Sequence, residues 1–179
     1  IFLDKHYVAI QFYALPNQST KDQLHAAGID LGDYLPNNTY AAAVSKDISI
    51  ASLKLFNIRG IFQLAAYQKA GSFLLNGNAP AHAVKQSGYA DINIVTYEKI
   101  NSATVQTAIA FLNAAIIEDV PAFKMFTVRV SLVNAKKLAD LPFVQWVEFI
   151  DPPNQPENLL GRSLHRVNVL KDGVRNLKG

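Results

Sequence analysis

The chain has 179 residues, half of them apolar and 17% charged, which allows one large or two small domains with a buried core. Seventeen basic residues against 14 acidic ones give a formal charge of +3, which is only weak support for a nucleic-acid partner. The absence of cysteine excludes disulfides, thiolate nucleophiles and cysteine-based zinc sites. No run approaches the roughly 18 apolar residues of a membrane span.

The first half of the chain alternates patterns typical of strands and helices. Residues 7–12 alternate apolar and polar side chains, which is the period of a half-buried strand. Ser19 is the candidate cap of a helix that ends near Gly28. The elements that follow are predicted as a strand over 39–44, a helix over 49–56 and a strand over 58–64.

The same order of patterns returns in the second half, about 85 residues later. Ser102 is the candidate cap of a helix over residues 102–115, in which apolar side chains recur at the spacing of one helix face. Those side chains are Val105, Ala108, Ile109 and Leu112. The flanking elements are predicted as strands over 92–97, 125–130 and 144–150 and a helix over 132–141.

We interpret each half as having the order β-α-β-β-α-β, in which one more strand, without assigned bounds, follows the first helix; this order predicts an α+β fold of two tandem ferredoxin-like modules. Each module is expected to be an antiparallel four-stranded sheet with two helices on one face. The predicted division is a first module over 1–70, a linker over 71–88, a second module over 89–152 and an extended tail over 153–179. Within the linker, residues 71–79 are predicted as a loop and residues 80–86 as one helical turn.

Patterns typical of catalysis, metal binding and RNA binding are missing from the sequence. The four histidines have neither a partner at i, i+4 nor a carboxylate at a ligand spacing, and no nucleophile elbow or glycine-rich phosphate loop occurs. Residues 40–44 and 126–130 lack the basic-glycine-aromatic run of RNA-recognition sheets. We therefore expect a chain without catalytic residues, metal, cofactor, nucleic-acid partner or membrane partner.

The last strand is predicted to be apolar on both faces, although a sheet with helices on one side only is usually polar on the other. One face holds Val144, Trp146, Glu148 and Ile150. The opposite face holds Val147 and Phe149. Two explanations stay open at this point: the extra apolar face packs against the first module, or a partner protein covers it.

The closing segment carries a resemblance to a known family. Residues 138–148 run from a helix through a short proline-containing turn into the strand Val-Gln-Trp-Val-Glu. This segment, together with residues 7–12, the helix from Ser19 and the strand over 39–44, resembles the inhibitory propeptide of bacterial subtilisin-like serine proteases. Both halves fit, over about 145 residues, so the chain resembles a tandem of such modules.

Residues 157–170 resemble the entry into the catalytic domain of that family, whose triad aspartate we expect shortly beyond Gly179. The resemblance implies a non-catalytic prosegment of a secreted protease that chaperones folding of its catalytic domain, inhibits it and is then cut off. It also implies that a sheet face, here Trp146, Glu148 and Ile150, contacts the catalytic domain. The tail residues expected in the substrate cleft and processing region are Asn158, Leu159, Leu160, Gly161 and Arg162.

Three points stay open in this interpretation. The family has one module where this chain has two, and we favour the second for docking because it adjoins the tail. Leu159 and Leu160 are equally well explained by a contact with the module's own core. The alternative function is a tandem of ACT-like regulatory modules that bind a small molecule, with a pocket near the linker.

An acylphosphatase-type enzyme is disfavoured because the loops over 14–18 and 98–101 contain no arginine.

Overall fold

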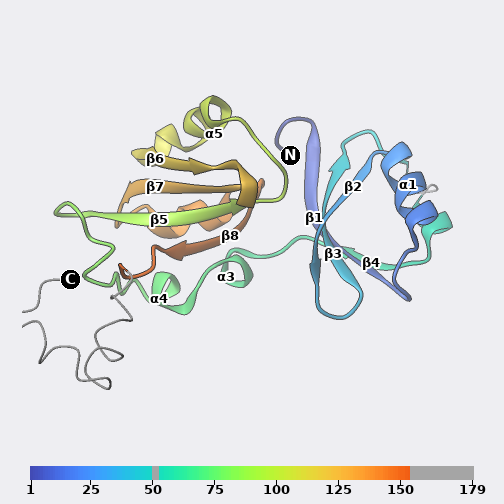
Figure 1. Cartoon of the computed structure of the whole chain (residues 1–179), viewed down its shortest axis with the longest axis horizontal. Coiled ribbons are helices and arrows are strands. Elements are labelled where there is room, and N and C mark those ends of the chain that lie inside the picture. Colours follow the sequence, from blue (N-terminus) through green and yellow to red (C-terminus); the bar gives the residue numbers. More distant parts are fainter. Residues whose placement is uncertain (50–52, 154–179) are drawn as a thin grey trace, which may run out of the picture.

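Two four-stranded antiparallel sheets form the framework of this computed structural model, which describes residues 1–49 and 53–153 (Figure 1). The strand order is β2-β3-β1-β4 in the first sheet and β6-β7-β5-β8 in the second. The predicted α+β class and the two antiparallel four-stranded sheets are therefore confirmed.

The first module follows the predicted order of elements. Its elements are β1 (Lys5–Phe12), α1 (Gln18–Ala26), β2 (Ile29–Leu35), β3 (Thr39–Ser45), the 3-10 helix η1 (Lys54–Phe56) and β4 (Ile58–Phe62). The alternation in β1 turns Ile10 and Phe12 toward α1, where they pack with Leu24. The cap of this helix is Asn17, two residues before the predicted Ser19, because the Asn17 side chain accepts a hydrogen bond from the backbone N–H of Thr20.

The second module repeats this pattern. Its elements are β5 (Tyr89–Thr96), α5 (Ser102–Ile109), η2 (Ala110–Leu112), β6 (Ala114–Val120), η3 (Pro121–Phe123), β7 (Met125–Ser131), η4 (Ala135–Asp140) and β8 (Val144–Phe149). Asn101, not Ser102, caps α5 by accepting from the backbone N–H of Thr104. The α-helix is shorter than predicted, because it tightens into η2 and ends where Asn113 adopts a left-handed backbone with φ +54°.

The second helix predicted in each half differs from expectation. In the second module, the predicted helix over 132–141 is the 3-10 helix η4, whose buried side chains are Ala135, Leu138 and Ala139. Small alanines beside a single leucine allow this tight turn to lie close to the sheet. In the first module, residues 50–52 of the predicted helix lie outside the described residues, and the described end is η1.

The connection between the modules packs on the second module. It contains α3 (Ala66–Lys69) and α4 (Ser72–Leu75), so the predicted loop over 71–79 was wrong for residues 72–75. Ala70 pairs in parallel with Val147 of β8, and the N–H of Gly71 donates to the Val147 carbonyl at 3.1 Å. Leu74 of α4 is buried in the core of the second module. Apolar burial thus turns part of the linker into a cover for one edge of the second sheet.

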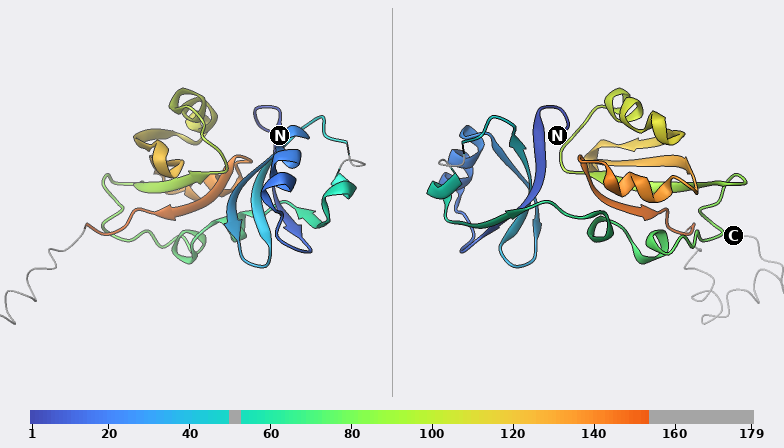
Figure 2. Two further views of the ribbon diagram at one scale, coloured as in Figure 1. Left: turned by 45° about the vertical axis from the view of Figure 1, so that its right-hand side comes forward. Right: turned by 180° about the vertical axis from the view of Figure 1, so that it is seen from behind.

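The first sheet stands crosswise against one end of the second module (Figures 1 and 2). The face of this sheet opposite α1 contributes Tyr7, Ala41 and Ala43 to the core of the second module. A Cβ atom on Gly32 would lie 3.3 Å from the carbonyl oxygen of Tyr97, so the backbones approach closely there. The rings of Tyr7 and Tyr97 lie 5.4 Å apart between centroids. Small residues on the first sheet thus make room for the loop that follows β5.

Hydrogen bonds and ion pairs hold the two modules in a defined position relative to each other. The Tyr7 hydroxyl donates to a Glu98 carboxylate oxygen at 2.7 Å, and the Lys5 ammonium lies between Glu98 and Asp30. Burial and the hydrogen bond to Glu98 raise the pKa of Tyr7, and the hydrogen bond to Glu98 is the main cause of the raised pKa of Lys5. Lys124 adds an ion pair across the contact, with its ammonium 2.6 Å from an Asp33 oxygen.

Removing the Glu98 carboxylate tests how strongly the modules depend on each other. We expect Glu98→Ala to lower the free energy of unfolding by about 1–3 kcal/mol, because the Tyr7 hydroxyl and Lys5 lose a partly buried acceptor. Asp4→Ala, which removes the exposed ion pair with Lys46, is the control and should cost less than about 1 kcal/mol. Urea unfolding measures both changes, and equal costs would contradict the importance of the module contact.

Lys69 gives a pH-dependent test of how the linker packs. Its ammonium is buried and donates to the Leu141 carbonyl at 3.1 Å. Burial lowers the pKa of Lys69, although the nearby Asp140 partly opposes this. The unfolded chain keeps the proton to a higher pH, so the Lys69 contribution to stability rises with pH below the ordinary lysine pKa of about 10.5.

We therefore expect Lys69→Met to stabilise the protein most at neutral pH, and progressively less as the pH rises through the lowered pKa of Lys69 toward the ordinary lysine value of about 10.5. Urea midpoints at several pH values give this difference. Lys137→Met, which replaces an exposed lysine, is the matched control, and its effect on stability should not change with pH. A pH-independent difference between the Lys69→Met variant and the wild type would show that Lys69 does not titrate as a buried amine.

Candidate docking surface on the second module

The strand β8 forms one edge of the second sheet and carries the site residues that the sequence predicts. In its pairing with β5, Trp146 lies opposite Val95 and Glu148 lies opposite Asn93. The register shifts between Val95 and Thr96, so that Thr96 pairs with Val144. Val144 is consequently buried in the core, and its predicted place on the same face as Trp146 was wrong.

The face of the second sheet opposite α5 is organised in cross-strand rows. The first row is apolar and crosses all four strands: we call it the apolar row, and it consists of Val120, Met125, Val95 and Trp146. It lies at the end of the sheet near the first module. Trp146 is 36% exposed in this position. An exposed indole beside aliphatic neighbours is the kind of surface that a protein partner covers.

The side chains of the next rows are polar, and most of them form hydrogen bonds with one another. Thr127 donates to the side chain of Asn93 at 2.9 Å, and Arg129 donates to both carboxylate oxygens of Asp91 at 2.7 and 2.9 Å. The hydrogen bond to Asp91 raises the pKa of Arg129. Because these groups have partners already, the centre of this face needs no partner to compensate buried polar atoms.

The predicted docking residues have different surroundings. Trp146 and Glu148 lie on this face, and Glu148 is exposed. Ile150 follows β8 and is half-buried: its N–H donates to the Asp91 carbonyl at 3.3 Å, and its carbonyl oxygen lies 2.8 Å from Nε2 of His82. The predicted tail residues 158–162 lie outside the described residues.

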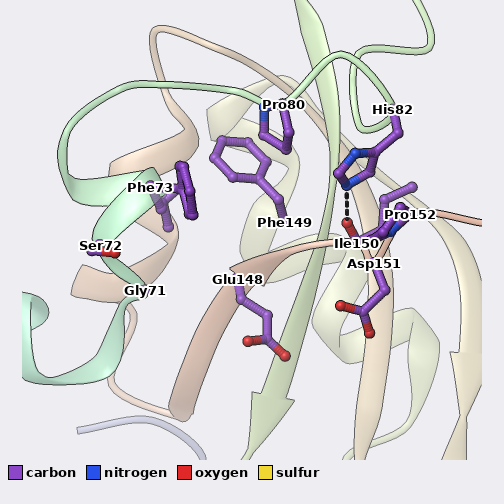
Figure 3. A pocket seen from close by; sticks show the side chains of 11 residues that line it. Gly71, Ser72, Phe73, Pro80, His82, Glu148, Phe149, Ile150, Asp151 and Pro152 are labelled. Carbon is purple, nitrogen blue, oxygen red and sulfur yellow. Dashed lines mark hydrogen bonds between the residues drawn. The ribbon is translucent and has the colours of Figure 1, made fainter.

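Some candidate residues could not be found from the sequence. Val95, Met125 and Val120 join Trp146 only through strand register, which no local pattern specifies. A pocket of about 350 Å³ also lies between α4 and the end of β8 (Figure 3). Phe73 and Phe149 line it on one side, and the carboxylates of Glu148 and Asp151 lie on the other. The linker creates this pocket by folding onto β8.

The structure supplies no metal centre within residues 1–49 and 53–153: no three side chains of His, Asp or Glu lie close enough to hold an ion there. No helix in the same ranges is both long and apolar enough to cross a bilayer.

A family described as a domain of unknown function (DUF8729) matches residues 2–65. The match spans the strands and helices of the first module and ends just before α3 begins at Ala66. It covers less than half of the chain. No curated protein and no solved structure matches the chain. The first module is therefore similar to this family, and the similarity carries no activity with it.

Trp146 is the only tryptophan in the chain, so its fluorescence reports on the apolar row directly. We expect acrylamide to quench the emission of the native protein, less than that of the urea-unfolded chain, because the indole is about one-third exposed. The exposed free indole of N-acetyltryptophanamide sets the upper reference. If acrylamide did not quench the emission of the native protein, another part of the chain would have to cover the apolar row.

Proposed function

We propose that this chain is the non-catalytic prosegment of a secreted subtilisin-like serine protease, and that it acts as an intramolecular chaperone and inhibitor. One observation carries the proposal. The open face of the first sheet is buried against the second module, whereas the corresponding face of the second sheet presents Trp146 and Glu148 to solvent. The surface suited to a protein partner is therefore on the second module.

The strand order supports the family resemblance. Both sheets place the first strand of the module between its third and fourth strands, the order expected for a ferredoxin-like module. We propose this arrangement for both modules, with η4 in the place of the second helix of the second module. The closing Val-Gln-Trp-Val-Glu segment forms the edge strand β8, with its tryptophan and glutamate on the open face.

Docking would use the apolar row and the rim around it. Docking would remove the apolar surface of Trp146 and its neighbours from water, and this burial stabilises the complex by about 25 cal/mol per Å². Because only the folded partner provides a complementary surface, docking favours the folded form of the partner. Binding only the folded catalytic domain stabilises that domain, which is the thermodynamic basis of a chaperone role. Glu148 would remain at the polar rim of the interface.

The tail completes the proposal. The strand β8 ends at Phe149 and the proline-rich sequence begins at Pro152, so the tail starts three residues beyond the strand that carries Trp146 and Glu148. An extended segment binds a protease cleft through main-chain hydrogen bonds, and prolines reduce the entropy lost on ordering. We propose that residues 158–162 occupy the cleft and processing region. The proposed partner is the chain's own catalytic domain outside the cytoplasm, and the prosegment uses no cofactor.

The first module would act as a support in this arrangement. Its sheet holds the loop over 97–100 through Tyr7 and Lys5, and this loop continues directly from β5, which carries Val95 of the apolar row. The ACT-like alternative places a small ligand at the contact between modules. The pocket between α4 and the end of β8 lies near the linker, as this alternative expects. At the contact between the modules, however, Tyr7, Tyr97 and Glu98 fill the space, which favours the prosegment over the alternative.

The proposal predicts that the gene encodes a subtilisin-like catalytic domain after Gly179, with a strand ending in Asp-x-Gly within about thirty residues. The purified chain should inhibit peptide hydrolysis by that domain at micromolar concentration or below. Trp146→Ala should weaken inhibition at least about tenfold, because it removes the aromatic side chain of the apolar row.

Phe111→Ala is the matched control for this measurement. Phe111 is an exposed aromatic on η2, outside the docking face, and its removal should leave inhibition unchanged. Lack of inhibition at micromolar concentration would refute the proposed function, and saturable binding of a small metabolite without any effect on the protease would favour the ACT-like alternative.

A further inference from the structure

We propose that the pocket between α4 and the end of β8 binds an extended peptide segment in which a large apolar residue neighbours a lysine or arginine. This site is at the edge of the second sheet, whereas the proposed protease contact uses its open face. The inference therefore does not rest on the proposed function.

The peptide groups of β8 provide the first argument. The N–H of Ile150 donates inward to Asp91 of β5, whereas the carbonyl of Val147 points outward and accepts from Gly71 of the linker. In an antiparallel pair these directions alternate along the strand, so the peptide groups of Phe149 point outward as well. Ala70 pairs with Val147, the Gly71 N–H donates to the Val147 carbonyl, and the linker then turns into α4. His82 of the linker contacts the Ile150 carbonyl, so the outward peptide groups of Phe149 lie between two linker segments and can pair with one residue of an extended chain.

The apolar wall provides the second argument. Phe73 is 67% exposed, although it stands on a short helix whose neighbour Leu74 is buried. Its ring lies near Phe149 and Pro80 on one side of the pocket (Figure 3). The volume of about 350 Å³ is at the small end of the range for ligand pockets, roughly 300–1,000 Å³. It suits one large apolar side chain that points from a peptide lying along the edge.

Charge provides the third argument and selects the neighbouring residue. Glu148 and Asp151 are exposed and line the side of the pocket opposite Phe73 (Figure 3). Neither carboxylate forms an ion pair or a hydrogen bond with any other side chain in residues 1–49 and 53–153. Successive side chains of a strand point in opposite directions, so a residue next to the apolar anchor turns toward this side. A lysine or arginine there would neutralise both carboxylates.

His82 shapes the pocket without competing for the ligand. Its Nε2 atom is engaged with the Ile150 carbonyl at 2.8 Å, which holds the turn around Pro80 against the end of β8. The part of the wall around Pro80 is consequently set before any ligand enters. A pre-formed wall lowers the conformational cost of binding.

The test uses the full chain and two acetylated, amidated pentapeptides, Thr-Thr-Phe-Arg-Thr and Thr-Thr-Phe-Glu-Thr, and follows their binding by amide chemical-shift titration. We expect the arginine peptide to bind at least about tenfold more tightly than the glutamate peptide, with shifts at Phe149 and in α4. Raising the salt concentration should reduce this preference. Equal binding of the two peptides, or no binding of either at millimolar concentration, would overturn the proposal. Shifts that depend on protein concentration alone would assign the edge to a second copy of this chain and would also overturn it.

Two variants separate this site from the proposed protease contact. Phe73→Ala and Asp151→Asn should each weaken binding of the arginine peptide at least about threefold. Both change exposed side chains that the core does not need. Trp146→Ala and Phe111→Ala should leave peptide binding unchanged. If Trp146→Ala weakened peptide binding as much as Phe73→Ala, the ligand would lie on the open face and the edge site would be wrong. Loss of protease inhibition with intact peptide binding would refute only the proposed function.

Discussion

The burial of the first sheet's open face against the loop after β5 is the contact on which the arrangement of the molecule depends. Ala41 and Ala43 are small enough for that loop to come close, and Tyr7 closes the contact with its ring and its hydroxyl. The loop is held from its own side too, because the Thr96 hydroxyl donates to the Glu98 carbonyl and the Tyr97 N–H donates to the Phe143 carbonyl. Two rigid surfaces therefore meet, and the modules behave as unequal partners: one uses its sheet face for the contact and the other keeps its face exposed.

This asymmetry gives a physical reason for the presence of two modules in one chain. A sheet with helices on one side leaves a second face that must be polar, covered by the chain itself or covered by a partner. The first sheet is covered by the chain itself, while the second combines a polar centre, where Arg129 binds Asp91, with the apolar row at one end. The linker adds a second difference between the modules, because Lys69 and Leu74 attach it to the second module and leave a pocket at the end of β8.

Sequence periodicity predicted most of the secondary structure and failed where local hydrogen bonds or tertiary packing decide. The helix caps were placed on serines, but asparagines one or two positions earlier accept the backbone N–H bonds. Within the predicted helix over 132–141 the structure has the 3-10 helix η4 (Ala135–Asp140), because period alone does not distinguish the two kinds of helix over so few residues. Val144 was placed on the wrong face because a register shift interrupts the alternation just before Trp146.

By itself, the sequence determined the repeat, the α+β class, the strand alternation and the unusual apolar character of the last strand, because all of these are written in the spacing of neighbouring side chains. Tertiary structure alone decided which sheet face is covered, which residues join Trp146 in a row across four strands, and that the linker lies along β8. These features depend on strand register and on the fit of surfaces such as Gly32 against Tyr97, residues 65 positions apart in the chain. Local patterns contain no information about such contacts, because the free energy that selects them arises only when the modules pack together.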